Sequence, residues 1–190
     1  MFTIISSEQF KQVPWKNGKG ITTELVVKQN ESSSEFLWRI SIAPMNTSGT
    51  FSDFSGYMRH LVLLKGNHLE LNHHENGVQK LTSPLSVASF DGANTTFGLL
   101  NFGSVQNFNV MVRKENYKAH VHTYHSETSL KLKGTADTFL FSPTHPLQIT
   151  TSDRSYQLNE GDLAHASEAL HVVGKHFIVV EISHQNSIKS

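Results

Sequence analysis

The stretch Gln106-Asn107-Phe108-Asn109-Val110-Met111-Val112-Arg113 alternates between two kinds of side chain along its length. Successive side chains of a β-strand point to opposite faces of its sheet. One face would therefore carry Phe108, Val110 and Val112, and the other Asn109, Met111 and Arg113. The stretch predicts a strand with one apolar and one largely polar face.

Similar short stretches, rich in Val, Ile, Leu, Phe and Thr, recur between clusters of Gly, Asn, Ser and Pro. They are Phe36–Ala43, His60–Leu64, Ser86–Phe90, Thr96–Phe102, Thr138–Phe141, Gln148–Thr151 and His176–Ile182. Short strands separated by turn residues are typical of an antiparallel sandwich or barrel. Helical periodicity is weak, and Ser6–Gln12 and Ala164–Leu170 are the segments where a helical turn is expected. The sequence predicts an all-β fold.

A chain of 190 residues can form one large core or two small fused barrels. The polar segment between Arg113 and Ala119 follows the most clearly patterned strand and is the best candidate for a boundary. We therefore predict two halves, residues 1–115 and residues 116–190. Each half contains enough predicted strands for a small barrel or half-sandwich.

The composition argues against several classes of function. Sixteen basic and sixteen acidic residues cancel, so no large field would attract nucleic acid or an anionic membrane. The chain has no cysteine, which excludes disulfides, thiolate nucleophiles and Cys-ligated zinc. Met1–Lys11 lacks a signal-peptide pattern, and no apolar run approaches the length of a membrane span. We expect a cytoplasmic protein with neither a nucleic-acid nor a membrane partner.

The segment Trp15–Glu24 reads Trp-Lys-Asn-Gly-Lys-Gly-Ile-Thr-Thr-Glu, a composition that core packing rarely requires. Backbone N–H groups at Asn17, Gly18 and Gly20 could cradle an anion, although a tight turn entering a strand explains the glycines equally well. Trp15 could stack on a planar ligand, whereas Trp38, on the apolar face of its strand, is expected in the core.

Three arginines, Arg39, Arg59 and Arg113, lie on or beside predicted strands. The planar guanidinium offers a fork of donors that matches a carboxylate. The competing interpretation of each arginine is exposure on the outside of a sandwich. Glu24 has two interpretations as well, a ligand contact or a structural ion pair with one of the arginines.

Four motifs, taken together, resemble the HutD/Ves family in order and spacing within residues 1–115. They are Trp15–Glu24, Trp38–Ala43, Gly49–Arg59 and Asn107–Arg113. The resemblance implies a bicupin, two jelly-roll-like β-barrels in one chain, with strands that can be exchanged between the halves. It implies no established enzymatic activity and no cofactor. HutD-like members are linked to bacterial histidine utilisation, where binding of a pathway intermediate has been suggested, and Ves-like members to cold or stress responses.

Two positions depart from the family pattern. Lys19 stands where the family usually has glycine, and Asn107 stands where it usually has aspartate. The first change adds a positive charge and the second removes a negative one. If these positions face the pocket, both changes favour anion binding.

The leading hypothesis is therefore a non-enzymatic protein that binds a small carboxylated metabolite: urocanate, N-formylglutamate or histidine. The arginines would neutralise the ligand, while Asn17, Ser41 and Asn109 orient it and Trp15 covers it. The predicted site comprises Trp15, Lys16, Asn17, Gly18, Glu24, Arg39, Ser41, Arg59, Asn109 and Arg113, with no metal ligand. The sequence leaves open whether the chain forms a homodimer.

The alternative is a metal-dependent cupin enzyme, an isomerase or oxygenase. The spacing His120-x-His122-x4-Glu127-x6-Gly134 matches the first metal motif of cupins, and His171 could supply a fourth ligand. Several other positions of the cupin motifs do not match, among them Lys114, Ser167 and Ala169. A third interpretation is a regulatory module whose ligand-bound state another protein reads.

Overall fold

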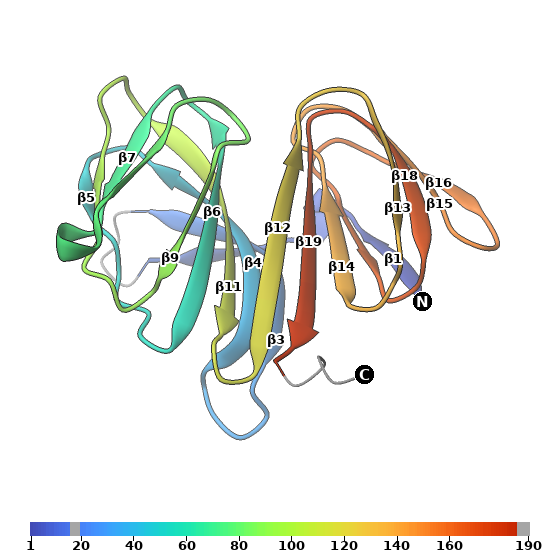
Figure 1. The fold of residues 1–190 in the computed structure, drawn as a ribbon, viewed down its shortest axis with the longest axis horizontal. Helices are drawn as coiled ribbons and strands as arrows, with labels where there is room; N and C mark the ends of the chain where they lie inside the picture. The colour runs from blue at the N-terminus through green and yellow to red at the C-terminus, as the bar shows by residue number, and fades with distance from the viewer. Residues whose placement is uncertain (16–19, 186–190) are drawn as a thin grey trace. The chain divides into compact units, whose positions relative to one another are not determined.

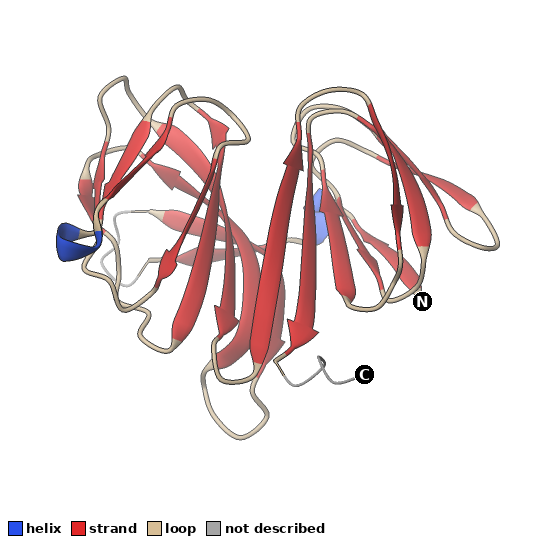
Figure 2. Cartoon of the chain, in the orientation of Figure 1, coloured by secondary structure: helices blue, strands red, loops and turns tan. Residues whose placement is uncertain are grey.

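The computed structural model describes residues 1–15 and 20–185, and Figure 2 shows that their regular secondary structure is almost entirely β-strand, joined by loops. Helix within these ranges is confined to two 3₁₀ turns, η1 (Ser7–Gln9) and η2 (His74–Asn76). No helix in the described part of the chain is long and apolar enough to cross a membrane. The all-β prediction is confirmed.

The chain divides into two compact units, which do not follow the predicted halves at the N-terminus. Residues 11–118 form one unit, and residues 1–10 join residues 119–190 in the other. The predicted boundary at 115/116 lies close to the observed break between Lys118 and Ala119. The first ten residues belong to the unit of residues 119–190, and not to the unit formed by the residues that follow them in sequence.

The unit of residues 11–118, called here the N-terminal unit, consists of two antiparallel sheets (Figure 1). The six-stranded sheet has the order β2 (Lys11–Pro14), β3 (Ile21–Gln29), β4 (Phe36–Met45), β11 (Val105–Arg113), β6 (Tyr57–Lys65) and β9 (Val87–Asp91). The four-stranded sheet has the order β5 (Gly49–Thr50), β10 (Phe97–Leu99), β7 (Leu69–Asn72) and β8 (Val78–Leu81). Their facing sides share an apolar core that includes Leu61, Leu63, Leu69, Leu71 and Phe90.

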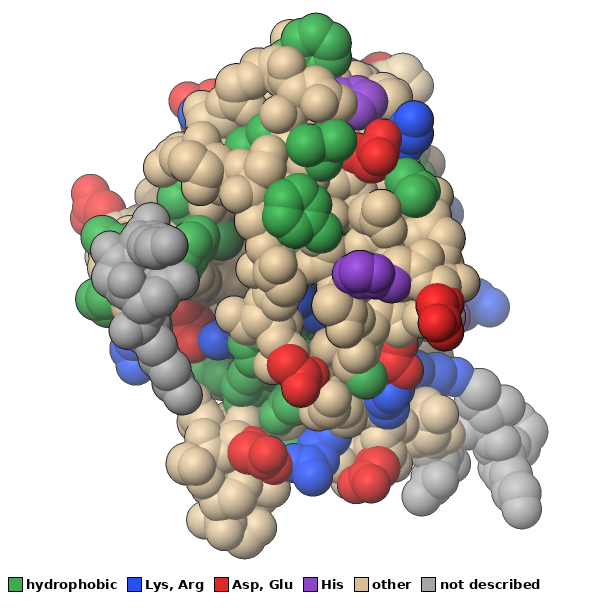
Figure 3. All heavy atoms as spheres, turned by 90° about the vertical axis from the view of Figure 1, so that its left-hand side faces the viewer, with side chains coloured by type: hydrophobic (Ala, Val, Ile, Leu, Met, Phe, Trp, Pro, Cys, Tyr) green, Lys and Arg blue, Asp and Glu red, His purple; other side chains and the backbone are tan. Residues whose placement is uncertain are grey.

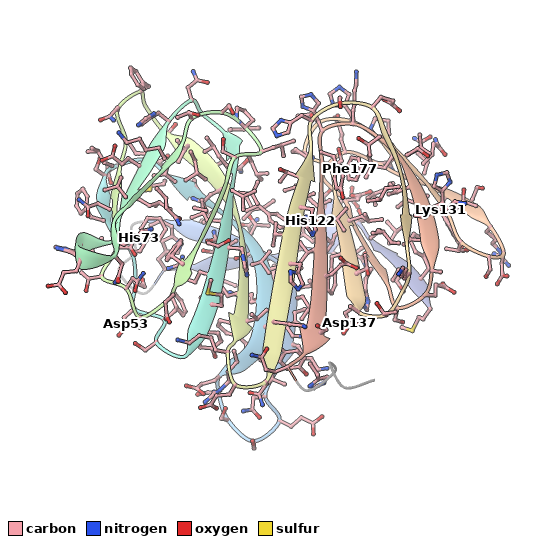
Figure 4. All side chains as sticks on the ribbon, viewed as in Figure 1. Asp53, His73, His122, Lys131, Asp137 and Phe177 are labelled. Atoms are coloured by element: carbon pink, nitrogen blue, oxygen red, sulfur yellow. The ribbon has the colours of Figure 1, made fainter. Side chains whose placement is uncertain are left out.

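The unit of residues 1–10 and 119–190, called the C-terminal unit, repeats this plan. Its five-stranded sheet has the order β1 (Phe2–Ile5), β17 (Leu163–Ala166), β14 (Asp137–Phe141), β19 (Phe177–His184) and β12 (Tyr117–Tyr124). Its four-stranded sheet has the order β13 (Thr128–Leu132), β18 (Leu170–Gly174), β15 (Leu147–Thr150) and β16 (Ser155–Leu158). Phe177, labelled in Figure 4, lies in its core and stacks on Tyr124 at 4.7 Å between ring centroids.

The first residues are held in the C-terminal unit by backbone pairing and by one buried carboxylate. β1 pairs with β17 from Phe2 opposite Ala166 to Ile5 opposite Leu163. The N–H of Ser7 then donates to Oδ1 of the buried Asp162 at 2.8 Å. Each unit is thus a jelly-roll-like sandwich of two open sheets rather than a closed barrel.

A helical turn expected at Ala164–Leu170 is not observed. Residues Leu163–Ala166 form β17, which has a strand partner on each side, β1 and β14. The segment from Leu170 onward is β18. Pairing on both sides gives the backbone N–H and C=O groups of β17 hydrogen-bond partners, and this outweighs the local preference for a helical turn.

Gly134, in the connection between β13 and β14, is a position that only glycine fits, because it has φ +70° and no room for a side chain. A Cβ atom there would lie 2.1 Å from the carbonyl carbon of Glu168 and 2.4 Å from the nitrogen of Ala169. Gly134→Ala is expected to lower the free energy of unfolding by about 2–4 kcal/mol, measured by urea denaturation. The matched control is Gly161→Ala at φ +81°, where nothing lies within 4 Å. The control is expected to cost about 1–2 kcal/mol, and equal losses in the two variants would contradict the role assigned to crowding.

Candidate functional site

The register of the six-stranded sheet aligns polar residues across its three central strands. On β11, Met111 lies opposite Arg39 of β4 on one side and opposite Arg59 of β6 on the other. Two residues along, Asn109 lies opposite Ser41 of β4. Neighbouring strands are about 4.8 Å apart, so the two arginine backbones lie about 10 Å apart across β11. The sheet therefore presents two cationic side chains on one face.

This face is the one that points into the core of the N-terminal unit. On β6, the alternation that includes Arg59 continues through Leu61 and Leu63, and both leucines belong to the apolar core cluster. Phe90, which pairs with Arg59 from β9, belongs to the same cluster. The arginines are thus carried on the inner side of the sandwich, not on its solvent side.

Arg59 is buried and has aromatic rather than acidic neighbours. Its side chain is 6% exposed. Its guanidinium carbon lies 5.1 Å from the ring centroid of Phe51, 5.3 Å from that of Phe54 and 5.1 Å from that of Phe90. Nε of Arg59 is buried without a hydrogen-bond partner among the described residues. Ring faces stabilise a cation, although they do not cancel its charge.

The side chain of Arg59 donates a hydrogen bond to the first of two neutral amides, which are themselves linked by a hydrogen bond. Nη2 of Arg59 donates to Oδ1 of Asn109 at 3.4 Å, and Nδ2 of Asn109 donates to Oδ1 of Asn107. Both asparagines are buried. In residues 1–15 and 20–185 no carboxylate forms an ion pair with Arg59. The buried positive charge is therefore solvated by dipoles and rings alone.

Arg39 is half-buried and shares an aromatic neighbour with Arg59. Its guanidinium carbon lies 4.7 Å from the ring centroid of Phe36 and 5.6 Å from that of Phe54, which also contacts Arg59. Nη2 of Arg39 approaches Sδ of Met111 at 3.5 Å. Nε of Arg39, like that of Arg59, has no hydrogen-bond partner within the described ranges. Both guanidiniums therefore lie near the same ring, that of Phe54.

The electrostatics of this arginine pair favour the binding of an anion. Burial lowers the pKa of Arg59 to about 10, and the positive charge of Arg39 acts in the same direction. Burial also lowers the pKa of Arg39, an effect that the negative charge of Glu24 opposes. A pKa near 10 still leaves Arg59 charged at neutral pH. An anion placed between the two guanidiniums would therefore offset the cost of burying their charges and reduce the repulsion between them.

Trp15 and Gly20 close the hairpin between β2 and β3. The N–H of Trp15 donates to the carbonyl of Gly20 at 2.9 Å, and its indole Nε1–H donates to Oγ1 of Thr22 at 2.8 Å. A Cβ atom on Gly20 would lie 2.9 Å from carbons of the Trp15 ring, so glycine permits the indole to lie against the backbone. Trp15 is half-buried. The predicted site residues Lys16, Asn17 and Gly18, together with Lys19, lie outside the described residues, so their role stays a prediction.

Glu24 and Ser41 extend the polar face toward β3. They lie opposite each other in the register, with Ser41 buried and Glu24 half-buried. Glu24 forms no ion pair at contact distance with any described residue. It acts on Arg39 through its charge. Ser41 and Asn109 thus lie in the row next to the arginines, with Glu24 beyond Ser41.

Arg113 is engaged elsewhere. It ends β11, where Nη1 forms an ion pair with Glu35 and Nε lies 3.8 Å from Glu115. The hydrogen bond that Arg113 donates to Glu35, and then the negative charge of Glu35, raise the pKa of Arg113. Because this guanidinium already has two acidic neighbours, the structure groups Arg39 with Arg59 and leaves Arg113 with the glutamates.

Several residues around the arginine pair were not predicted as part of the site. Phe51, Phe54 and Phe90 supply the ring faces, and Asn107 ends the amide chain. Phe51 and Phe54 lie within the third family motif, which was the available signal. His73, beside η2 and labelled in Figure 4, is also buried and lies 4.7 Å from Phe90 between ring centroids. Burial lowers its pKa, and the charge of Arg59 contributes in the same direction.

The ligand set of the metal-enzyme alternative is not brought together. His120 and His122 are exposed on β12, where Figure 4 labels His122, and Glu127 is exposed beyond the end of that strand. His171 lies on β18 of the other sheet, where its Nε2 bonds Oγ of Ser129 at 2.8 Å. Among the described side chains, no three His, Asp or Glu residues are arranged to hold a metal ion as they stand.

Several apolar side chains of the N-terminal unit are exposed. They include Val78, Val87, Phe97 and Phe102. Figure 3 shows one face, on which the apolar side chains are interrupted by polar and charged ones. Scattered exposed apolar residues of this kind are ordinary.

Comparison with known proteins identifies the family. A protein of the hutC 3′ region of Pseudomonas putida, described as uncharacterised, is 27% identical over 154 residues, covering 81% of this chain and 80% of the relative. Protein Ves of Escherichia fergusonii is 33% identical over 108 residues, 56% of each chain.

Solved structures show the same fold. HutD from Pseudomonas fluorescens SBW25, in a formate condition, superposes with a TM-score of 0.84 at 23% identity, covering 98% of this chain and 100% of that one. A cupin 2 conserved barrel domain protein from Leptotrichia buccalis superposes with a TM-score of 0.56 at 11% identity, covering 90% and 92%. The predicted cupin-type fold is confirmed. The HutD family model matches residues 7–178, and the chain therefore belongs to the HutD family.

Proposed function

We propose that this chain binds a small carboxylated metabolite between Arg39 and Arg59, on the inner face of the six-stranded sheet, and that it acts as a binding protein rather than as an enzyme. The observation that carries the proposal is the pair of guanidiniums that share Phe54 and have no ion-pair partner among the described residues. An unpaired buried cation is costly, and function is a common reason for retaining one.

The arrangement of rings constrains how a ligand would approach. Phenyl rings lie against both guanidiniums, so the donors remaining for a ligand are at their edges. The two Nε atoms, which are buried and have no hydrogen-bond partner among the described residues, are such edge donors. A carboxylate lying in the plane of a guanidinium accepts two parallel hydrogen bonds, the strongest geometry available to it. In this arrangement Ser41 and Asn109 would orient the rest of the ligand, and Trp15 would cover its far side.

The chemistry of the site favours binding over catalysis. The groups closest to the pair are guanidiniums, amides, a thioether and phenyl rings. The guanidiniums hold charge, and they and the amides donate hydrogen bonds, but none of these groups exchanges protons near neutral pH.

The relatives suggest which carboxylates to test. Because one relative is named for a hutC 3′ region and a solved relative is named HutD, we infer a cytoplasmic role in moderating histidine utilisation. Urocanate, N-formylglutamate and histidine are the candidate ligands. The similarity to protein Ves supports a role in a stress response as the second candidate.

Calorimetry tests the ligand assignment. Titration of the purified chain is expected to show binding of urocanate or N-formylglutamate. The affinity is expected to weaken at high salt, because it depends on the attraction between the ligand carboxylate and the guanidiniums. Histidine is expected to bind less tightly, since its ammonium group would face two cations. If none of the three binds at millimolar concentration, the ligand assignment fails.

Replacement of Arg59 tests whether the charge is retained for binding. Arg59→Met keeps an unbranched, though shorter, side chain and removes the buried charge, so the ligand-free protein is expected to be more stable by about 1–3 kcal/mol. The same variant is expected to lose anion binding. Arg113→Met, which breaks a rim ion pair, is the matched control and is expected to give no such gain. Destabilisation by Arg59→Met would show that the cation is a structural element.

Asn107→Asp tests the amide chain. A carboxylate at this position would accept from Asn109 and compensate the charge of Arg59 through it, so affinity for an anion is expected to fall about tenfold. The ligand-free protein is expected to gain stability. Asn101→Asp places the same charge on an exposed residue and is the control. Equal binding by the two variants would remove Asn107 from the site.

A further inference from the structure

Three histidines from three different connections meet at one end of the C-terminal unit. The ring centroid of His176 lies 5.3 Å from that of His145 and 6.5 Å from that of His125. His125 follows β12, His145 lies between β14 and β15, and His176 immediately precedes β19. Figure 1 shows the end of β12 and the start of β19 at the same end of the unit. His125 and His176 are exposed, and His145 is half-buried.

One buried hydroxyl holds two of these connections together. Ser142, which is 0% exposed, donates through Oγ to the carbonyl of His176 at 3.1 Å and accepts from the N–H of His145 at 3.4 Å. The backbone carbonyl of Ser142 also accepts from the N–H of Gly161 at 2.8 Å. The backbones that carry His145 and His176 are therefore fixed relative to each other before any ligand arrives.

Two local features distinguish these histidines from ordinary surface residues. Nδ1 of His145 lies 2.8 Å from Oγ1 of Thr144. If Nδ1–H donates in that bond, Nε2 keeps a lone pair that can bind a metal. A hydrogen bond of this kind fixes the tautomer and the ring orientation of metal-binding histidines. His176 has φ +52°, a left-handed conformation that residues with a Cβ rarely adopt.

We propose that His125, His145 and His176 form a binding site for a divalent transition-metal ion such as zinc. Two imidazoles on one tetrahedral zinc have ring centroids about 5 Å apart, because each Zn–N bond is about 2.0–2.1 Å. The 5.3 Å between His176 and His145 is close to this value, and the 6.5 Å between His176 and His125 is longer. The ring nitrogens do not converge as they stand, so the proposal requires the two exposed side chains to rotate about χ1 and χ2 when the ion binds, and exposed side chains change rotamer within nanoseconds.

Three imidazoles would leave an open fourth position that faces water. Imidazole nitrogen suits zinc, copper and nickel, and the exposure of His125 and His176 leaves room for water or another small ligand on the ion. Lys175 is exposed, so its ammonium can extend away from the ion into solvent. This site is in a different unit from Arg39 and Arg59 and does not depend on the function proposed for them.

Zinc and cobalt titrations of the untagged chain test the proposal. One Zn²⁺ per chain is expected by calorimetry, and Co²⁺ is expected to give the visible bands of a tetrahedral nitrogen site. His145→Ala with His176→Ala is expected to abolish the cobalt bands and to weaken zinc binding at least tenfold, and Thr144→Val to weaken it several-fold. His120→Ala with His122→Ala removes the same number of histidines from β12 and is expected to leave both readouts unchanged.

The outcomes separate the proposed site from general affinity of a histidine-rich chain for metals. Absence of zinc binding at roughly 0.1 mM, a free energy of only about 5 kcal/mol, would overturn the proposal. So would binding that survives loss of His145 and His176, or binding that is lost with His120 and His122. The circular dichroism of each metal-free variant shows whether it is folded like the parent chain.

Discussion

The buried charge of Arg59, which has no ion-pair partner among residues 1–15 and 20–185, is the constraint on which the N-terminal unit depends. Arg59 cannot leave the core because its strand, β6, lies inside the six-stranded sheet with a partner on each side. Its surroundings must therefore stabilise the charge, which they do with three phenyl rings and an amide. The roles of Phe51, Phe54, Phe90 and Asn109 all follow from that requirement.

The two units use one architecture for different purposes. In the C-terminal unit the cluster between the sheets consists of aliphatic and aromatic side chains, including Leu140, Leu147, Ile149 and Val172. In the N-terminal unit the inner face of the larger sheet carries Arg39 and Arg59 in addition to its apolar cluster. Apolar side chains in a core contribute stability, whereas buried cations with no ion-pair partner among the described residues reduce it, a cost that the proposed binding role would explain.

The alternation of single strands was readable from the sequence, and the pairing of strands was not. The pattern of residues 106–113 predicts which side chains share a face, and β11 follows it. That β11 lies between β4 and β6, and so places Met111 between two arginines, depends on pairings between segments far apart in the chain. The partner of Arg113, Glu35, is 78 residues away in sequence and lies in no motif. The segment expected to be helical at Ala164–Leu170 also shows long-range pairing prevailing over local preference.

The pairing of β1 with β17 has a consequence for how the chain is made. The residues of β1 leave the ribosome about 160 residues before their partners, Leu163–Ala166. At common synthesis rates that interval is of the order of ten seconds. Throughout it, Phe2 and Ile4, which pack against the core of the C-terminal unit, lack their final neighbours. Residues 11–118 can form their own two sheets in the meantime, so β1 reaches its final position only after the segment that follows it has folded.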